Sequence, residues 1–141
     1  MEQFTEQQDQ NFWKNAEHYM DVRQGRQKLQ KAYKLPCEYV IHTVGPIWNG
    51  GNQNEKELLV SCYLSSMQLA LEHKIRKIAF PSISTGVYSF PVGLAAKIAV
   101  NTVAGFLKEH PDDFDLVEWV LFDEHTELVY AIEVNAHNKG I

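Results

Sequence analysis

From Pro36 onward, short runs rich in β-branched and aromatic residues alternate with longer stretches of helical periodicity. The expected strands cover residues 39–44, 77–80 and 116–122, and the expected helices cover residues 54–73, a stretch beginning at Pro91 and a stretch following Asp123. Strands that alternate with helices pair in parallel through right-handed crossovers. The alternation therefore predicts an α/β fold with a narrow, mostly parallel sheet and helices packed on it.

Apolar spacing predicts the inner faces of two of these helices. The face of the first carries Leu58, Cys62, Ser65 or Ser66, and Leu69. The face of the second carries Ala95, Ala99, Val103 and Phe106. The last helix, which carries Leu128, Val129 and Ile132, has Asp123 as a candidate N-cap.

The first 36 residues differ from the rest, because they are rich in Gln and carry aromatic residues at helical spacing. Thr5 and Gln8 fit a capping box, which predicts a helix over residues 5–20. Residues 24–31 fit a helix, an edge strand or a loop equally well. We expect a divergent helical segment over residues 1–36 and an α/β core over residues 37–141, within one domain.

Composition excludes several classes of protein. A chain of 141 residues with 45% hydrophobic side chains can bury a core without disulfides or metal, and Cys37 and Cys62 are too few for a disulfide framework. The net charge of −5 argues against nucleic-acid binding. No apolar run reaches the roughly 20 residues of a membrane span. We therefore expect a cytoplasmic protein with neither nucleic acid nor membrane as partner.

The segment between the second strand and the second helix is the best candidate for a binding site. It has small hydroxyl residues, Gly86, and then the aromatic Tyr88 and Phe90. Unpaired backbone amides in such a turn form an anion nest, and the following helix N-terminus adds partial positive charge. The pattern favours a phosphate site, although an ordinary loop whose hydroxyls bond local amides fits the composition equally well.

Other candidate sites have weaker support. The glycine-rich stretch 45–51 lacks the spacing of a dinucleotide or Walker loop and is interpreted as a surface loop. The six histidines lack metal-ligand spacing, so we expect no metal and no cofactor. Cys37, His42 and Ser84 match no nucleophile motif. Asp123 and Glu124 could be an acid/base pair, but a helix cap explains Asp123 better.

Several segments, in order, resemble the macrodomain family. Ile83-Ser84-Thr85-Gly86-Val87-Tyr88 resembles its second phosphate loop, and the stretch 39–46 with Trp48 and Gly50-Gly51 resembles the strand and loop before it. The stretch 120–123 resembles its last strand and turn. The resemblance covers about residues 35–134.

The resemblance implies a three-layer α/β/α sandwich that binds ADP-ribose. It places Ser84 to Tyr88 around the diphosphate and distal ribose and Phe122 near the adenine. The implied ligand-binding residues are Ile83, Ser84, Thr85, Gly86, Val87, Tyr88 and Phe122. The resemblance assigns no catalytic residue.

The chain departs from the family pattern before residue 37. It lacks the two initial strands, the acidic residue that reads adenine and the Asn-rich run leading into a glycine-rich loop, so it resembles a truncated macrodomain. In the hydrolase branch those parts position the attacking water. The implied function is ADP-ribose recognition, with residual hydrolysis of ADP-ribosyl or O-acetyl-ADP-ribose esters.

Two alternatives stay open. A degenerate homologue would serve as an interaction or assembly module without a ligand, and a phosphate-ester enzyme of another class would use the same amide nest. Lost strands would also uncover a sheet edge and apolar surface. We therefore expect a homo-oligomer, a dimer or larger.

Overall fold

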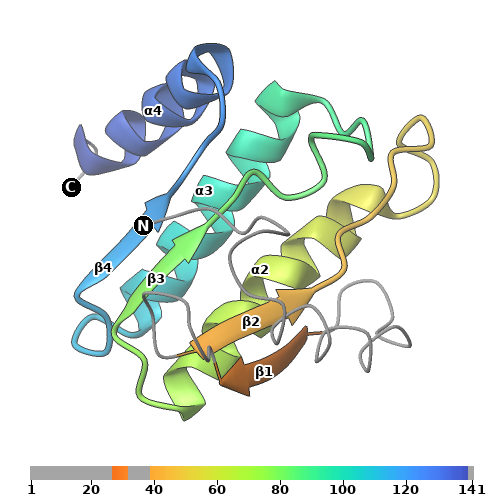
Figure 1. Cartoon of the computed structure of the whole chain (residues 1–141). Helices are drawn as coiled ribbons and strands as arrows, with labels where there is room; N and C mark the ends of the chain where they lie inside the picture. The colour runs from red at the N-terminus through yellow and green to blue at the C-terminus, as the bar shows by residue number, and fades with distance from the viewer. Residues whose placement is uncertain (1–26, 32–38, 140–141) are drawn as a thin grey trace.

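A computed structural model of the chain describes residues 27–31 and 39–139 (Figure 1). Its elements are, in order, β1 (Gln27–Lys31), β2 (Tyr39–Thr43), α2 (Glu55–Glu72), β3 (Lys77–Phe80), α3 (Val92–Glu109), β4 (Leu116–Trp119) and α4 (Glu124–Lys139). The predicted alternation of strands and helices is confirmed. The helix expected over residues 5–20, and Cys37, lie outside the described residues.

The described strands form two separate two-stranded sheets. β3 and β4 pair in parallel, from Lys77 opposite Leu116 to Phe80 opposite Trp119. β1 and β2 pair antiparallel, which assigns a strand to part of the ambiguous segment 24–31. The prediction of one narrow, mostly parallel sheet is right for the pairing of β3 and β4, but it is wrong in joining β2 to them, since β2 forms no ladder with β3. Alternation along the chain identifies strands, but it does not specify which strand edges meet.

The register of β3 and β4 is held at their start by a pair of charged side chains. The Arg76 guanidinium donates to the Asp115 carboxylate from Nε over 3.1 Å and from Nη2 over 3.0 Å. The Asp115 amide donates to the Arg76 carbonyl oxygen over 2.7 Å. Hydrogen bonding to Arg76 lowers the pKa of Asp115. At the other end, the Val120 amide donates to the Phe80 carbonyl oxygen over 2.8 Å, so the segments following β3 and β4 begin side by side.

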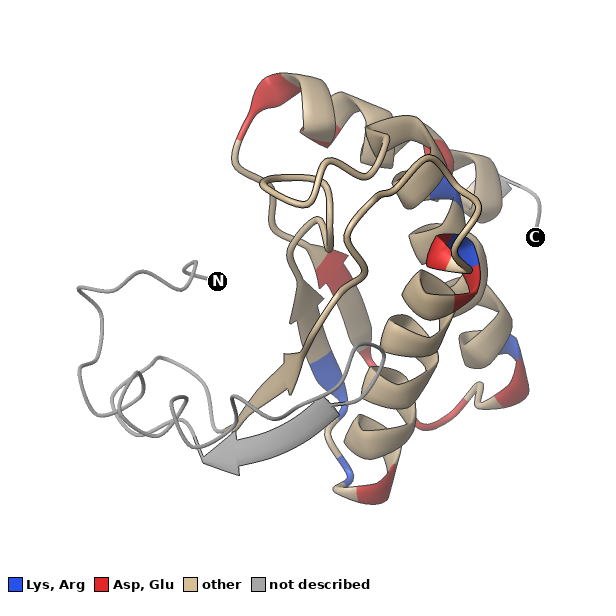
Figure 2. Cartoon of the chain, turned by 90° about the vertical axis from the view of Figure 1, so that its right-hand side faces the viewer, with Lys and Arg blue, Asp and Glu red and all other residues tan. Residues whose placement is uncertain are grey.

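The three described helices form one layer, in which α2 packs on α3 and α3 packs on α4. Figure 2 shows these helices together on one face of the strands. The α/β fold class is confirmed, and the described residues supply two of the three expected layers. No described helix is long and apolar enough to cross a membrane.

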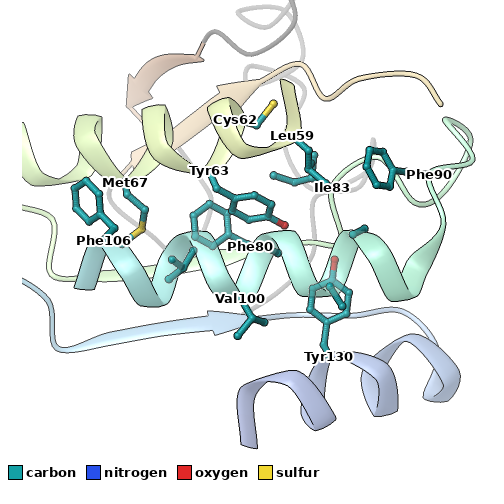
Figure 3. Packing of buried hydrophobic residues seen from close by; sticks show 14 residues of the cluster. Leu59, Cys62, Tyr63, Met67, Phe80, Ile83, Phe90, Val100, Phe106 and Tyr130 are labelled. Carbon is teal, nitrogen blue, oxygen red and sulfur yellow. The ribbon is translucent and has the colours of Figure 1, made fainter. Parts of the chain in front are cut away.

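The core lies between the helical layer and the strands (Figure 3). Its buried members include Leu59, Cys62, Tyr63, Met67, Phe80, Ile83, Phe90, Ala95, Ala96, Ala99, Val100, Val103, Phe106 and Tyr130. The face predicted for α3 is confirmed. The face predicted for α2 is correct at Cys62 and Ser66 but wrong at Leu58 and Leu69, which are half-buried. Leu59 and Ala70 are buried instead, because the contact with α3 turns the inner face by about one residue.

Asp123 caps α4, as predicted. Its carboxylate accepts a hydrogen bond of 2.8 Å from the Thr126 amide and one of 3.1 Å from the Thr126 hydroxyl. These two hydrogen bonds lower the pKa of Asp123. The cap accounts for the carboxylate at this position without an acid/base role.

Candidate functional site

The segment between β3 and α3 forms a compact loop at the carboxyl end of β3. Ser84 and Ser89 have left-handed backbone conformations, with φ of 68° and 61°. The Phe90 amide donates to the Ser84 carbonyl oxygen over 2.9 Å, and the Ser89 amide donates to the Gly86 carbonyl oxygen over 3.0 Å. These hydrogen bonds fold residues 84–90 back on themselves.

Four consecutive amides at the tip of this loop are available to a ligand. Within the described part of the chain, the N–H groups of Thr85, Gly86, Val87 and Tyr88 make no hydrogen bond. The Val87 side chain is 95% exposed, and a Cβ added at Gly86 would meet nothing within 4 Å. Unpaired amides at an open turn favour the anion nest over an ordinary loop. We call residues 84–88 the amide loop.

The hydroxyl groups of this segment are not used to satisfy those amides. Ser82 Oγ lies 2.5 Å from Thr85 Oγ1 and 2.9 Å from Tyr130 Oη. The Ser89 hydroxyl donates to the Val87 carbonyl oxygen over 3.5 Å. Ser84 Oγ is buried without a hydrogen-bond partner among the described residues, so no described base activates it as a nucleophile. Composition also allowed an ordinary loop whose hydroxyls bond local amides. The described hydroxyls do not bond the amides of this loop, so the structure does not support that alternative.

The glycine-rich stretch after β2 packs against the amide loop. The Trp48 amide donates to the Tyr88 carbonyl oxygen over 2.9 Å, and the rings of Trp48 and Phe90 lie 4.8 Å apart. Gly45 is buried so close to the loop that an added Cβ would lie 2.2 Å from Ser84 Oγ. The interpretation of stretch 45–51 as a surface loop is therefore wrong for Gly45, Pro46 and Trp48. Their long-range contacts leave no local signal in the sequence.

A buried carboxylate shapes this second loop. Glu55, the first residue of α2, is 1% exposed and accepts hydrogen bonds from the amides of Asn49 over 2.9 Å, Gly51 over 2.7 Å and Gln53 over 2.5 Å. Burial alone would raise the pKa of Glu55, but the backbone hydrogen bonds outweigh it and lower the pKa. Sequence analysis missed Glu55. The available signal was its place directly after a loop containing Gly50 and Gly51, both of which have positive φ.

The two loops carry no charge of their own. Residues 44–53 and 81–91 contain no Lys, Arg, Asp or Glu, and Figure 2 shows the loops at this end of the molecule without charged residues. An anion placed here would meet backbone N–H groups and the N-terminal turn of α3 in place of charged side chains from these two loops. Such a site suits a phosphate ester with an adjacent flat group.

The other predicted site residues differ in how far they are exposed. The Ile83 side chain is buried in the core and is therefore not exposed to a ligand at the amide loop. Tyr88 is 37% exposed, and Phe122, just after β4, is 79% exposed. Burial lowers the pKa of His42 in β2. Among the described residues, no group of three His, Cys, Asp or Glu is placed to hold a metal ion.

Comparisons with known proteins identify the family. The family model described as Macro domain matches residues 2–99, which is more than half of the chain. The chain belongs to the macrodomain family. The match begins at residue 2, so it includes the N-terminal third that the sequence analysis placed outside the resemblance.

Several macrodomains of known sequence or structure are similar to this chain. An O-acetyl-ADP-ribose deacetylase from Citrobacter koseri is 48% identical over 108 residues, which cover 75% of this chain and 59% of the relative. An uncharacterized protein from Fusobacterium nucleatum is 53% identical over 106 residues, 75% of this chain and 60% of the relative. The chain spans 46% to 65% of the length of these and the other curated macrodomain relatives compared.

Two solved structures support the fold. The Oceanobacillus iheyensis macrodomain with ADP has a TM-score of 0.80 and 37% identity, over 94% of this chain and 68% of that chain. The Trypanosoma brucei macrodomain in complex with ADP has a TM-score of 0.82 and 32% identity, over 90% of this chain and 52% of that chain. The macrodomain resemblance inferred from residues 39–46 and 83–88 is confirmed.

Proposed function

We propose that this macrodomain binds ADP-ribose, with the diphosphate on the amide loop. The observation that carries the proposal is the set of four consecutive unpaired amides, from Thr85 to Tyr88, at the carboxyl end of β3. Ligands of open α/β sheets bind outside the carboxyl ends of strands. Related solved macrodomains are named as bound to ADP or ADP-ribose, which supports the choice of ligand.

The aromatic residues near the amide loop suit the remaining parts of ADP-ribose. In this proposal the half-exposed Tyr88 ring lies against the distal ribose, and the exposed Phe122 ring lies near the adenine. Phe122 follows β4, whose end is hydrogen-bonded to the end of β3 through Val120 and Phe80. A site that combines one anion nest with flat apolar faces distinguishes ADP-ribose from inorganic phosphate.

We propose that hydrolysis of ADP-ribosyl or O-acetyl-ADP-ribose esters is at most a residual activity of this chain. Two relatives are named O-acetyl-ADP-ribose deacetylase, which supports that substrate class. Residues 44–53 and 81–91 contain neither a carboxylate nor an imidazole to act as a general base. The resemblance assigns the positioning of water in the hydrolase branch to an Asn-rich run before a glycine-rich loop, and the expected Asn-Ala-Ala-Asn run does not occur in the sequence.

Isothermal titration calorimetry with ADP-ribose, with AMP as the control, tests the proposal. We expect micromolar binding of ADP-ribose that is selective over AMP, because AMP lacks the diphosphate and the distal ribose. No heat at millimolar ADP-ribose would favour the alternative of an interaction module without a ligand. Turnover of nucleotide phosphates without ADP-ribose binding would favour the alternative of another phosphate-ester enzyme.

We also propose that the chain forms a dimer or a larger oligomer. The exposed face of α4 carries Leu128 and Ile132, one turn apart and 60% and 59% exposed. Apolar groups gathered in this way favour association. Light scattering at micromolar concentration tests this proposal, and a monomeric mass would contradict it.

A further inference from the structure

A line of hydroxyl groups connects the core to the amide loop. The Tyr130 hydroxyl, on a side chain of α4 that is 2% exposed, lies 2.9 Å from Ser82 Oγ. Ser82 Oγ lies 2.5 Å from Thr85 Oγ1, and the Thr85 hydroxyl donates to the Ser82 carbonyl oxygen over 3.2 Å. Tyr130 is 48 residues from Ser82, so the last helix of the chain touches the start of the ligand-binding segment.

A second buried tyrosine, Tyr63, lies in the same core cluster as Tyr130. The Trp119 indole Nε1 donates to the Tyr63 hydroxyl oxygen over 3.4 Å. Figure 3 shows Tyr63 from α2 and Tyr130 from α4 within the same buried cluster. Burial raises the pKa of both Tyr63 and Tyr130. Both phenols therefore keep their protons at neutral pH and can act as donors.

The number of protons available fixes which hydroxyl donates in each of these hydrogen bonds. A hydroxyl group has one proton to donate. The Thr85 proton goes to the Ser82 carbonyl, so the bond between the two hydroxyls uses the Ser82 proton. The Ser82 proton is then occupied, so the bond between Ser82 and Tyr130 uses the Tyr130 proton. Tyr130 and Ser82 therefore each donate toward the amide loop, and Thr85 is the last donor.

We propose that Tyr130 is a positioning residue that, through Ser82, holds the Thr85 hydroxyl ready to donate to an oxygen of the bound diphosphate. This inference rests on the proposed function. Because the Thr85 oxygen already accepts from Ser82, its own proton is the part that is free to turn from the Ser82 carbonyl to a ligand oxygen. A hydrogen bond to a charged phosphate is stronger than one to a neutral carbonyl, so the ligand competes successfully for that proton.

Removing the Tyr130 hydroxyl removes the first donor in this series of hydrogen bonds. In Tyr130→Phe, Ser82 loses its donor and is free to rotate away from Thr85. We expect ADP-ribose to bind about three- to tenfold more weakly, the effect of one hydrogen bond. The matched control is Tyr39→Phe, because Tyr39 is 41% exposed at the start of β2, away from the amide loop. This control should bind as the wild type does. Ser82→Ala tests the same step without changing the Tyr130 side chain and should weaken binding to the same extent.

A double-mutant cycle separates positioning from general destabilisation. Thr85→Val removes the final donor, whereas Thr85→Ser keeps a hydroxyl at this position and should bind more tightly than Thr85→Val. If Tyr130 acts through Thr85, Tyr130→Phe weakens binding in the wild type but has no further effect on affinity in Thr85→Val. A purely structural role for Tyr130 would weaken binding by the same factor in both backgrounds, which would overturn the inference.

Calorimetry with ADP-ribose on these variants and the wild type also distinguishes the two proposals. Unchanged affinity in both Tyr130→Phe and Ser82→Ala, beside a wild type that binds, overturns the positioning role alone. A wild type that does not bind ADP-ribose overturns the proposed function and this inference with it. Weakened binding in both variants, with wild-type affinity in Tyr39→Phe and tighter binding in Thr85→Ser than in Thr85→Val, is the result that supports the inference.

Discussion

The amide of Trp48 donates to the carbonyl oxygen of Tyr88 over 2.9 Å and thereby joins the loops that follow β2 and β3. The Trp48 ring then packs on Phe90 with ring centroids 4.8 Å apart. Tyr88 closes the amide loop, and Phe90 precedes α3. The position of the proposed phosphate site therefore depends on a segment about 40 residues earlier in the chain.

Trp48→Ala should lower both stability and ADP-ribose affinity. We expect a loss of about 2 to 4 kcal/mol in unfolding free energy, at or below the range for a fully buried aromatic, because Trp48 is half-buried. Chemical denaturation measures the first effect and calorimetry the second. Ile47→Ala is the control, since Ile47 is 45% exposed. Equal stability of the two variants would show that Trp48 does not hold the loops together.

Two glycine-to-alanine substitutions should have opposite effects on the free energy of unfolding. Gly45→Ala places a Cβ 2.2 Å from Ser84 Oγ and 2.7 Å from the Ile83 side chain. We expect it to destabilise the fold by about 1 to 3 kcal/mol through overpacking. Gly105→Ala lies in the interior of α3 with open space around it and should stabilise by about 0.5 to 1 kcal/mol through helix propensity. Thermal denaturation checks both. A Gly45→Ala protein as stable as the wild type would contradict the close approach of the two loops.

Glu55→Gln should change the response of stability to acid. The folded-state pKa of Glu55 lies below its ordinary value of 4.5. The ionised carboxylate therefore contributes stability that is present above that value and is lost as the pH falls through the lower folded-state pKa. In Glu55→Gln this part of the acid dependence should disappear, and stability at neutral pH should fall. Melting temperatures across the acid range measure this.

The control for Glu55 is Glu57→Gln, a substitution in the same helical turn. Glu57 is exposed, so its replacement should leave the acid profile of the wild type unchanged. If both variants show the same profile, the hydrogen bonds from Asn49, Gly51 and Gln53 do not set the pKa of Glu55.

Local patterns predicted the elements that local forces determine. The four residues of β3, the inner face of α3 and the Asp123 cap follow from apolar periodicity and capping chemistry, which act over a few residues. The amide loop was identified for the same reason, since a Gly and small hydroxyl residues between a strand and a helix are visible in sequence.

Long-range partners could not be predicted in this way. The antiparallel pairing of β1 with β2 depends on which strand edges meet, and no local pattern encodes that. Glu55 resembles an ordinary acidic residue in the first turn of a helix, because its three amide donors gather only once the preceding loop has folded. Tyr130 was likewise invisible, since its partner Ser82 comes from another element.

The most direct test of the central claim is ADP-ribose calorimetry on Gly86→Glu beside Gly105→Glu. A side chain at either glycine meets nothing within 4 Å, so both variants should fold. Gly86→Glu places a carboxylate beside the amides of the loop, where it repels the diphosphate, whereas Gly105 is exposed on α3. We predict that binding is lost in Gly86→Glu and kept at wild-type affinity in Gly105→Glu. Wild-type affinity in Gly86→Glu would show that the diphosphate is not bound at the amide loop.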